Sequence, residues 1–585
     1  MRFGSPKWKS RLIPWRADIA AACYRKSRKI DARISFARYA AAFTAFVLVL
    51  AAFALTVASR GATRYLLPAA GILPAALALL WWNTGESGGP SAPPAWTLRS
   101  LLILYVLGTL VFLSWTSRTT GEGDESAYCF QARVFAAGGL AAEAPTMDSV
   151  DAAHTSGFFF NQHIMRGGRW FGKYPPGWPA LLAVAYLARL DWLLNPLLGL
   201  VLLWIVNRIG LLCFDEQTGR LAVIILLLSP MFFFNCLGYY SHVLSAVLLA
   251  AASWCTIVAI RRDSAAAAAV ALLALGADVL VRPFSAACFW PVVVGAMLWS
   301  ARSGRKRAVY WLTLAVVLPG AALGVMVLYN HALTGSYLLS LYALYRDSGA
   351  PTEVVLGGTS LVNNLMHLTV RSIAKTTVAV VAFPCLVLVA GAALLPAGVR
   401  RSEVWLLAAL SVVLVAGYMV QTDMSASVIG ERYYFESLFA WALLAARGCQ
   451  RMPAGDRFAR ATTRAAAVLI VAIQLVQFGY FGRIVHQGLQ PLAVMRRTVE
   501  GSPLSNAVVF MKSSEGFRAG NLNLNSPAWK RARLVFLPDP GVAQRAAYTC
   551  ALSRQAWVVF SYRQGRAYLE DRQPISCAAR APRPD

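Results

Sequence analysis

The sequence predicts an α-helical polytopic membrane protein that ends in a small α/β domain. Three observations predict it: long apolar runs without charge, an uneven distribution of basic residues between these runs, and a change of composition near residue 482. Hydrophobic residues make up 58% of the 585 residues and charged residues only 14%, whereas about 25% of a typical globular chain is charged. The apolar content excludes a disordered chain, and ten cysteines in this length exclude a disulfide-rich secreted scaffold.

Membrane spans are predicted where an uncharged apolar run approaches the roughly 20 residues that cross a bilayer. Counting such runs gives about 13 transmembrane helices. We expect residues 37–97 to hold two additional helices and residues 98–481 to form the main membrane domain. The predicted spans are 37–58, 65–82, 98–116, 195–212, 219–236, 241–260, 265–281, 283–300, 308–328, 376–396, 403–421, 431–447 and 463–481.

Basic residues indicate which side of the membrane each loop faces. The first 38 residues hold 11 Lys and Arg against two Asp, so residues 1–36 are expected to be a cytoplasmic segment under the positive-inside rule. A cleavable signal peptide is not expected, because the basic stretch is long and no small-residue cleavage site follows a short apolar core. Four later loops must then be inside as well, and together they hold 13 Lys and Arg against two Asp. These loops are 261–264, 301–307, 397–402 and 447–464.

The net charge of +28 therefore follows from membrane topology, and no nucleic-acid partner is predicted. We expect a multi-pass protein of this kind to be located in a plasma membrane, with membrane lipids among its partners. The Ala-rich composition, with Arg preferred over Lys, is typical of a high-GC bacterium, so we expect the bacterial inner membrane.

The same orientation places three long regions outside: 117–194, 329–375 and 482–585. The apolar stretch 177–190 lies in the first of them and is short for a span. A span there would also move every later basic loop to the outer side. We therefore expect an interfacial or re-entrant helix at 177–190.

The region after residue 482 is expected to be an extracytoplasmic α/β domain. Its apolar segments shrink to NAVVFM, ARLVFL and AWVVFSY, which are separated by Pro, Gly and Asn and are typical of strands. A helix is expected near 541–552. Cys550 and Cys577 lie in this polar region and can pair if the domain faces an oxidising compartment.

Three carboxylates follow the span at 98–116. Glu122, Asp124 and Glu125 stand in the sequence TTGEGDESAYCF, directly before an expected amphipathic helix. Mutual repulsion and nearby lipid are expected to raise the pKa of a carboxyl group there, which suits a general base. The alternative is structural, since an acid at a helix N-terminus also caps that helix.

A basic and aromatic segment lies further along the same outer loop, in NQHIMRGGRWFGKYPPGW. Its cations Arg166, Arg169 and Lys173 stand beside Trp170 and Tyr174, and such a group can hold a phosphate at the level of lipid headgroups. The structural alternative is an ordinary interfacial belt of aromatics and snorkelling cations. The Pro-Pro-Gly sequence predicts a sharp turn.

Two charged pairs are expected at the same outer rim. Asp278 with Arg282, and Arg432 with Glu436, are both spaced i,i+4 and can share one helix face. Ionisable groups at membrane depth are functional candidates, although each pair can also be a self-neutralising contact between packed helices. His242 belongs to this rim, as a packing residue or as a ligand-binding residue.

Motifs for other chemistries are absent from the sequence. It has no HExxH or CxxC metal spacing and no GxxxxGK[ST] phosphate loop. No metal site and no cofactor is therefore predicted. Whether the protein uses a divalent cation is not decided by the sequence.

These residues carry a resemblance to a known family. The acidic GDES after an early span, the amphipathic helix, and KYPPGWPALL before a further helix resemble the integral membrane glycosyltransferases of the GT-C fold. This superfamily contains the protein O-mannosyltransferases and the aminoarabinose transferases of lipid A. The resemblance extends to LVRPF, YNHALTG and ERYYFE, in the same order, over roughly residues 98–481.

The resemblance implies transfer of a sugar from a polyprenyl-phosphate donor to an acceptor on the outer side of the membrane, with inversion. The acceptor is an envelope lipid, polysaccharide or protein. Asp124 matches the first acidic position and would be the general base, with Glu125 assisting. Lys173 and Arg282 sit in matching motifs and would neutralise the departing phosphate, because charge develops there in the transition state. Arg432 is a third candidate for this role, outside the matching motifs. The further candidates for substrate binding are Arg169, His242 and Tyr174.

Two other functions stay in competition. A transporter or a flippase for lipid-linked glycans suits about 13 spans equally well, although transporters usually carry paired repeats and ionisable residues near the midplane. A non-catalytic assembly subunit would keep the fold without needing Asp124 or Glu125.

Overall fold

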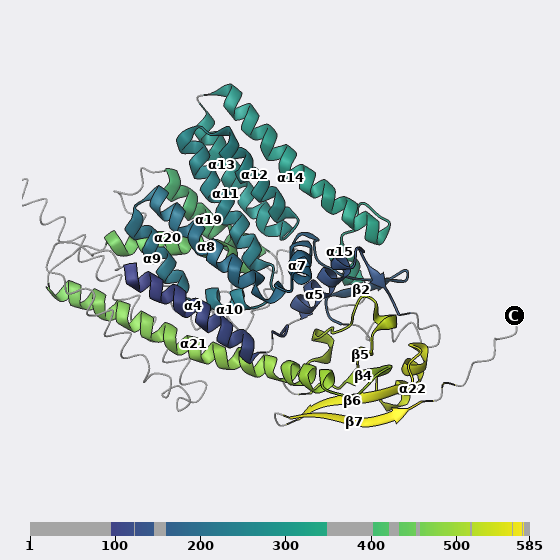
Figure 1. The fold of residues 1–585 in the computed structure, drawn as a ribbon. Helices are drawn as coiled ribbons and strands as arrows, with labels where there is room; N and C mark the ends of the chain where they lie inside the picture. Colours follow the sequence, from purple (N-terminus) through teal and green to yellow (C-terminus); the bar gives the residue numbers. More distant parts are fainter. Residues whose placement is uncertain are drawn as a thin grey trace, which may run out of the picture.

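The chain folds into a bundle of helices joined to a small mixed sheet (Figure 1). The computed structural model describes residues 95–116, 118–121, 123–145, 160–302, 304–347, 402–420, 432–451, 457–514, 517–563, 566–575 and 577. The expected cytoplasmic segment 1–36, the expected spans 37–58, 65–82 and 376–396, and the carboxylate Glu122 lie outside the described residues.

Five described helices are long and apolar enough to cross a membrane. A sixth span is possible if α9 and α10 are counted as one, although they meet at an angle of 66°. Ser229 lies at this bend, where its side chain caps α10, and Pro230 occupies the first turn of α10. Proline is tolerated in the first turn of a helix, where no intrahelical hydrogen bond needs its N–H, but it disrupts the helix further inside. The five helices are α4 (Ala95–Trp115), α8 (Asp191–Cys213), α11 (His242–Arg262), α13 (Pro283–Ala301) and α14 (Arg305–Thr334), and the bent pair is α9 (Glu216–Leu227) with α10 (Pro230–Leu237).

Other expected spans form different helices. The run predicted at 431–447 begins as a 3-10 helix, and the run at 463–481 lies inside one helix of 44 residues. The stretch 177–190 is a short helix of 11 residues, as expected. These elements are α7 (Gly177–Leu187), α12 (Ala265–Val279), α19 (Ser402–Val420), η4 (Arg432–Ser437), α20 (Leu438–Arg451) and α21 (Arg457–Glu500).

Part of the predicted outer loop 117–194 folds together with α15 into a layer at one end of the bundle, called the outer layer below. The amphipathic helix expected after the carboxylates is present as α5. A β-hairpin follows, and Gly167 and Gly168 form its turn with φ of 56° and 70°, the left-handed geometry of a two-residue hairpin turn. The elements of this layer are α5 (Gly123–Ala136), β1 (Ala142–Glu143), β2 (His163–Arg166), β3 (Arg169–Gly172) and α15 (Leu341–Asp347), with strand order β1-β3-β2.

The residues after Glu500 form a four-stranded sheet in the order β5-β4-β6-β7. β4 is parallel to β5 and β6, whereas β7 is antiparallel to β6. The three predicted strand segments correspond to β4, β5 and β6, while β7 was not foreseen. The elements are β4 (Ala507–Met511), η5 (Ala519–Asn521), η6 (Trp529–Arg531), β5 (Leu534–Pro538), α22 (Val542–Ala551), β6 (Ala556–Arg563) and β7 (Arg566–Pro574).

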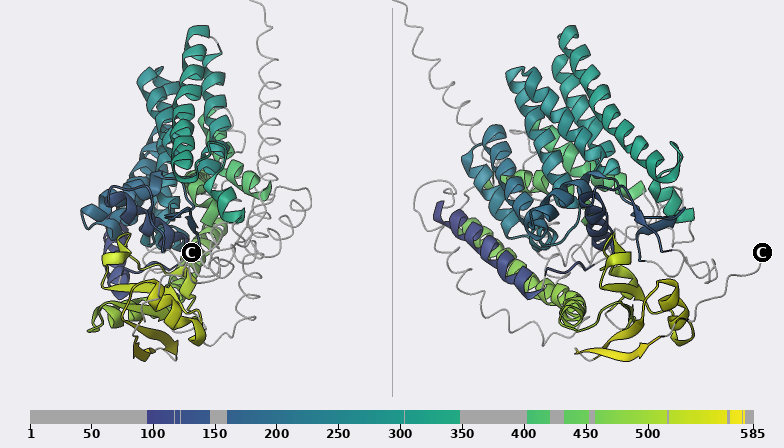
Figure 2. Two further views of the ribbon diagram at one scale, coloured as in Figure 1. Left: turned by 90° about the vertical axis from the view of Figure 1, so that its right-hand side faces the viewer. Right: turned by 45° about the vertical axis from the view of Figure 1, so that its right-hand side comes forward.

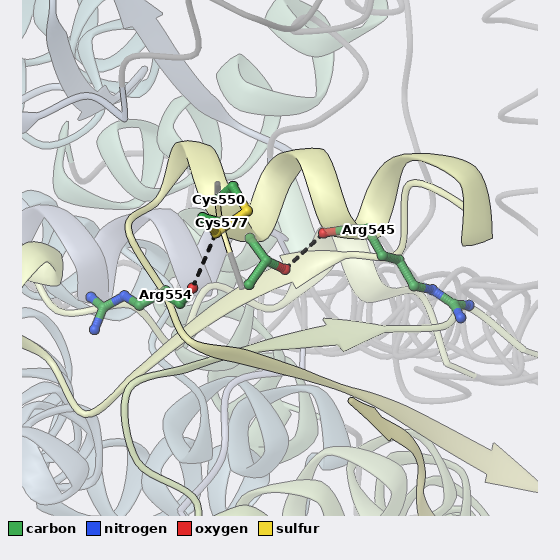
Figure 3. The surroundings of a disulfide bond; sticks show 5 residues. Arg545, Cys550, Arg554 and Cys577 are labelled. Atoms are coloured by element: carbon green, nitrogen blue, oxygen red, sulfur yellow. Dashed lines mark hydrogen bonds between the residues drawn. A yellow bond between two sulfur atoms is a disulfide. The ribbon is translucent and has the colours of Figure 1, made fainter. Parts of the chain in front are cut away.

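Cys550 and Cys577 form a disulfide, with 5.6 Å between their Cα atoms. Figure 3 shows that it joins α22 to the segment that follows β7. The bond closes a loop with a sequence separation of 27 residues, so it restricts the unfolded chain and stabilises the small domain.

The sheet domain begins later in the chain than expected, because α21 continues without interruption through residue 482 to Glu500. Its last turns contribute Leu492, Met495 and Val499 to the core of the sheet domain. The same core includes Phe130 of α5 and Trp170 of β3. In Figures 1 and 2 the outer layer accordingly lies between the helical bundle and the sheet, and α21 runs beside α4.

Candidate active site

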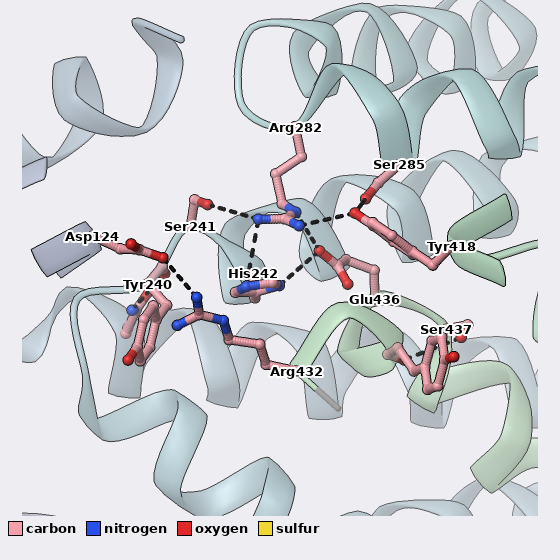
Figure 4. A network of polar contacts seen from close by, with 12 residues as sticks. Asp124, Tyr240, Ser241, His242, Arg282, Ser285, Tyr418, Arg432, Glu436 and Ser437 are labelled. Carbon is pink, nitrogen blue, oxygen red and sulfur yellow. Dashed lines mark hydrogen bonds and ion pairs between the residues drawn. The ribbon is translucent and has the colours of Figure 1, made fainter. Parts of the chain in front are cut away.

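Charged and aromatic side chains meet at one end of the helical bundle (Figure 4). They come from segments far apart in the sequence that all end or begin there: the start of α5, the link between α10 and α11, the turn between α12 and α13, the end of α19, and η4. The residues brought together are Asp124, Tyr240, Ser241, His242, Arg282, Ser285, Tyr418, Arg432 and Glu436.

Asp124 forms an ion pair with Arg432. The distance from Asp124 Oδ2 to Arg432 Nη2 is 2.7 Å, and the two side chains are 19% and 9% exposed. The Arg432 guanidinium also lies 4.8 Å from the centroid of the Tyr240 ring, which is within reach of a cation–π interaction. Asp124 is therefore held in one orientation, and part of its carboxylate remains accessible.

Glu436 is fully buried and joins Arg282 to His242. Its Oε1 lies 2.6 Å from Arg282 Nε and 3.0 Å from His242 Nδ1. Arg282 Nη2 also donates to the Tyr418 hydroxyl at 2.9 Å, and the pair is therefore bound to α19. The i,i+4 side-chain pairs predicted from spacing are wrong, because each arginine pairs with an acid on another element.

The backbone geometry of the segments that carry these residues explains why each arginine pairs with an acid from another element. Arg432 and Glu436 lie on a 3-10 helix, in which i and i+3 are superposed and i and i+4 are not. Arg282 precedes α13, and only its backbone N–H contacts Asp278, by donating to the Asp278 carbonyl at 2.7 Å. Asp278 itself is buried in α12.

Glu125 points away from Asp124 and binds backbone. Its Oε1 accepts from the N–H of Tyr239 at 2.7 Å, and its Oε2 accepts from the N–H of Gly121 at 2.6 Å. Charge-assisted hydrogen bonds of this kind are strong when buried. Glu125 therefore fixes the start of α5, which carries Asp124, against the link between α10 and α11.

Lys173 is buried among tyrosine rings. Its Nζ lies 4.4 Å from the ring centroid of Tyr345, and 5.5 Å and 5.6 Å from those of Tyr174 and Tyr342. Tyr174 also packs on Tyr128, with 4.4 Å between the ring centroids. The basic segment and α15 thus form an aromatic wall beside the acidic end of α5.

Gly177 attaches this segment to the turn that carries Arg282. Its N–H donates to the Leu280 carbonyl at 2.8 Å. A Cβ atom on Gly177 would lie 2.7 Å from that carbonyl oxygen, so the backbones approach as closely as only glycine permits. The Tyr-Pro-Pro-Gly turn expected from the sequence is therefore the contact between two of the predicted site segments.

Burial raises the pKa of Tyr128 well above its ordinary value, and the charge of Asp124 raises it further while Arg282 and Arg432 lower it. Burial is also the main cause that raises the pKa of Tyr174, followed by Asp124. Both hydroxyls are therefore neutral at physiological pH and are able to donate hydrogen bonds. Tyr128 lies close enough to all three charged groups to share one environment with them.

Arg169 does not join this group. It lies exposed on β3 and its Nη1 donates to the Ala332 carbonyl at the end of α14, at 2.6 Å. Four residues of this region were not predicted from the sequence: Tyr128, Tyr418, Tyr342 and Ser285. No spacing marks them, because each reaches the site only through the packing of its helix. Among the residues that the structure describes, no group of three His, Cys, Asp or Glu side chains could hold a metal ion.

No protein-family profile matches the chain, and no curated protein sequence matches it. Solved structures are similar to it at low identity. ArnT from Cupriavidus metallidurans, bound to undecaprenyl phosphate, shares 12% identity with a TM-score of 0.47, over 78% of this chain and 88% of that chain. The archaeal oligosaccharyltransferase AglB from Archaeoglobus fulgidus, in complex with an inhibitory peptide and a dolichol-phosphate, shares 11% identity with a TM-score of 0.45, over 80% of this chain and 69% of that chain.

Proposed function

We propose that this protein is a membrane glycosyltransferase of the GT-C type. It transfers a sugar from a polyprenyl-phosphate donor to an acceptor of the cell envelope, on the outer side of the bacterial inner membrane. The acceptor is a lipid, a polysaccharide or a protein. About 13 spans carry the site, the N-terminus is cytoplasmic and the sheet domain is extracytoplasmic.

The observation that carries the proposal is the ion pair between Asp124 and Arg432. It holds a partly exposed carboxylate at 2.7 Å from a guanidinium, beside the segments that supply Arg282 and Lys173. Glycosyl transfer from a lipid phosphate needs a base for the acceptor and cations for the departing phosphate. Both kinds of group meet here, and the motif resemblance assigns these roles to Asp124, Lys173 and Arg282.

In the proposed mechanism Asp124 accepts the proton of an acceptor hydroxyl. The hydroxyl oxygen attacks the anomeric carbon from the face opposite the phosphate, so the configuration inverts. The bond from the anomeric carbon to the phosphate oxygen breaks, and its electron pair leaves with polyprenyl phosphate. Arg432, Arg282 and Lys173 stabilise the charge that grows on this phosphate. The donor is already activated, so no cofactor enters the step.

The other residues position these groups. Glu125 fixes the start of α5 through two backbone N–H groups. His242 and Tyr418 hold the Arg282–Glu436 pair. Tyr174 and Tyr128 supply neutral hydroxyls next to Asp124, where they can bind the sugar.

The disulfide supports the outward orientation of the sheet domain. Disulfides form and persist in oxidising compartments such as the bacterial periplasm, and they are rare in the cytoplasm. Cys550 and Cys577 form such a bond. The orientation predicted from the basic loops assigns the domain to that side as well.

The test is a mass profile of envelope glycans and glycolipids from cells with the gene, without it, and with Asp124→Asn alone. We expect one sugar modification to be missing equally in the deletion and in the Asp124→Asn cells. Asp263→Asn is the matched control, because Asp263 is 64% exposed in an expected cytoplasmic loop and pairs with Arg307. It should restore the full profile.

Protein levels are checked by blot in each strain. A profile that is lost in the deletion but kept by Asp124→Asn would contradict glycosyl transfer by this site. Such a result would instead favour a transporter, a flippase or an assembly subunit.

A further inference from the structure

A cavity of about 420 Å³ lies at the junction of the membrane helices, the outer layer and the sheet domain. It is lined by a different face of α5 from the one that carries Asp124. Ser126, Cys129 and Arg133 point into it, and their spacing of three and four residues places them on one side of the helix. The other walls come from α7, the start of α8, the end of α21 and the strand β5.

The charge in this cavity is strongly positive. Four arginines line it against a single carboxylate, that of Asp191. Asp191 is close enough to three of the arginines to interact with their charges. A cavity with such an excess of guanidinium groups attracts an anion, and arginine binds phosphate oxygens with two parallel hydrogen bonds. The four arginines are Arg118, Arg133, Arg496 and Arg533.

One arginine has a donor group that no described residue uses. Arg133 Nη2 donates to the Asn523 carbonyl at 3.0 Å. Its Nε is buried and has no hydrogen-bond partner among the described residues. A buried donor without a partner is costly, so the described residues leave the hydrogen bonding of this cavity-lining arginine incomplete.

The surface next to the cavity is apolar. Leu182 and Tyr186 of α7 line the cavity itself. Tyr186 is 44% exposed, and Val184 and Leu187 on other sides of α7 and Leu190 after it are 65%, 68% and 46% exposed, so α7 is an apolar helix with much of its surface uncovered. An apolar surface of this kind next to a cationic cavity fits a molecule with a phosphate head and a hydrocarbon tail, and it offers nothing to a free phosphate ion.

We propose that this cavity binds the phosphate headgroup of an anionic membrane lipid, with the hydrocarbon chains lying along α7. The site is separate from the transfer chemistry and does not depend on it. Arg118 stacks on Trp192, with 3.8 Å from its guanidinium carbon to the ring centroid, and Arg533 donates to the Val499 and Ser502 carbonyls at the end of α21. A bound lipid therefore joins the sheet domain to the membrane helices.

The test uses the purified full-length protein in a neutral detergent and titration calorimetry with short-chain, soluble lipids. We expect dihexanoyl phosphatidic acid to bind, and dihexanoyl phosphatidylcholine and inorganic phosphate to bind at least tenfold more weakly. Arg496→Gln and Arg118→Gln should each weaken the binding of phosphatidic acid at least tenfold. Both side chains are exposed at the cavity, so neither change is expected to disturb folding, which a thermal melt checks.

Two further variants make the result specific. Arg531→Gln removes an exposed arginine of the same domain that does not line the cavity, and it should bind as the wild type does. Asp124→Asn should also bind as the wild type does, whether or not transfer is lost. Equal binding by wild type, Arg118→Gln and Arg496→Gln would overturn the proposal, as would absence of binding. Inorganic phosphate that binds as tightly as phosphatidic acid would show a soluble phosphate ligand and overturn the lipid assignment.

Discussion

Asp124 and Arg432 are separated by 308 residues in the sequence and by 2.7 Å in space. The contact joins the start of α5 to η4. Each of the two residues is held in position by its own contacts. Glu125 fixes the start of α5, which carries Asp124, through backbone N–H groups, and the Tyr240 ring packs against the Arg432 guanidinium. The proposed base is therefore positioned by groups that do not themselves react.

The first prediction concerns Arg432. Arg432→Gln removes a cation from Asp124 and from the departing phosphate, and we expect the rate of sugar transfer to fall about 10²- to 10³-fold. Arg432→Lys should retain part of the rate, because it keeps the charge without the forked geometry. The measurement is the initial rate in membranes at equal protein level. Arg262→Gln, at the exposed end of α11, is the control, and equal rates for both Gln variants would refute the role.

The second prediction concerns the buried Glu436. Glu436→Gln leaves the Arg282 guanidinium buried without its carboxylate, and we expect a loss of stability of about 3–5 kcal/mol. The double variant Arg282→Met/Glu436→Gln removes both charges and should unfold at a higher temperature than Glu436→Gln alone. The measurement is the thermal midpoint in detergent. A double variant less stable than the single one would show that the two residues do not act as a pair.

The third prediction concerns Gly177. A Cβ atom in Gly177→Ala would lie 2.7 Å from the Leu280 carbonyl oxygen, so the turn must move away from the segment with Arg282. We expect transfer to fall at least tenfold while the protein still folds, since a displacement of about 1 Å in a site can have this effect. Gly324→Ala, in α14 with open space around it, is the matched control. Full activity of Gly177→Ala would show that this contact does not position the site.

The fourth prediction concerns pH. His163 is buried between the outer layer and the sheet domain, where its Nδ1 donates to the Asn161 carbonyl at 3.0 Å and its Nε2 accepts from Asn523 Nδ2 at 3.0 Å. Burial lowers the pKa of His163 to about 4, below the value of about 6.5 in an unfolded chain. The unfolded state therefore binds the proton first, and stability falls as the pH drops from about 6.5 towards 4.

The slope is up to about 1.4 kcal/mol per pH unit in this window. His163→Gln lacks the titrating group, so the difference between its thermal midpoints at pH 7.5 and pH 5.0 should be smaller than that of the wild type. Identical differences in both proteins would refute the assignment to His163.

Local sequence signals predicted the secondary-structure elements better than they predicted which side chains pair with one another. The Asp and Glu before an amphipathic segment predicted α5, and the uncharged apolar runs predicted several of the long helices, because both are properties of neighbouring residues. The partners of Arg282 and Arg432 were predicted wrongly from i,i+4 spacing. An i,i+4 spacing brings two side chains together only if the segment is an α-helix. The segment with Arg432 and Glu436 is instead the 3-10 helix η4, in which this spacing does not place two residues on one face.

The remaining differences between the predicted and the observed structure come from tertiary packing. Tyr418 reaches Arg282 only because α19 packs against α13, and no local pattern encodes that contact. The hairpin of β2 and β3 was not predicted either, although Gly167 and Gly168 at its turn have the left-handed backbone geometry that two-residue hairpin turns require. The start of the sheet domain was misplaced because the last turns of α21 carry apolar residues that belong to the core of that domain.

The helix α21 has 44 residues and is about 66 Å long at 1.5 Å per residue, about twice the thickness of the hydrocarbon layer. One part packs Phe478 against Phe233 and Phe234 of α10, and the far end belongs to the core of the sheet domain. Pro491 lies inside the helix between these two parts, where a proline removes one backbone hydrogen bond and favours a bend. Each residue inserted into the helix would advance the sheet domain by about 1.5 Å and rotate it by about 100°. The height and the angular register of the two halves of the molecule are thus set by the number of residues in one helix.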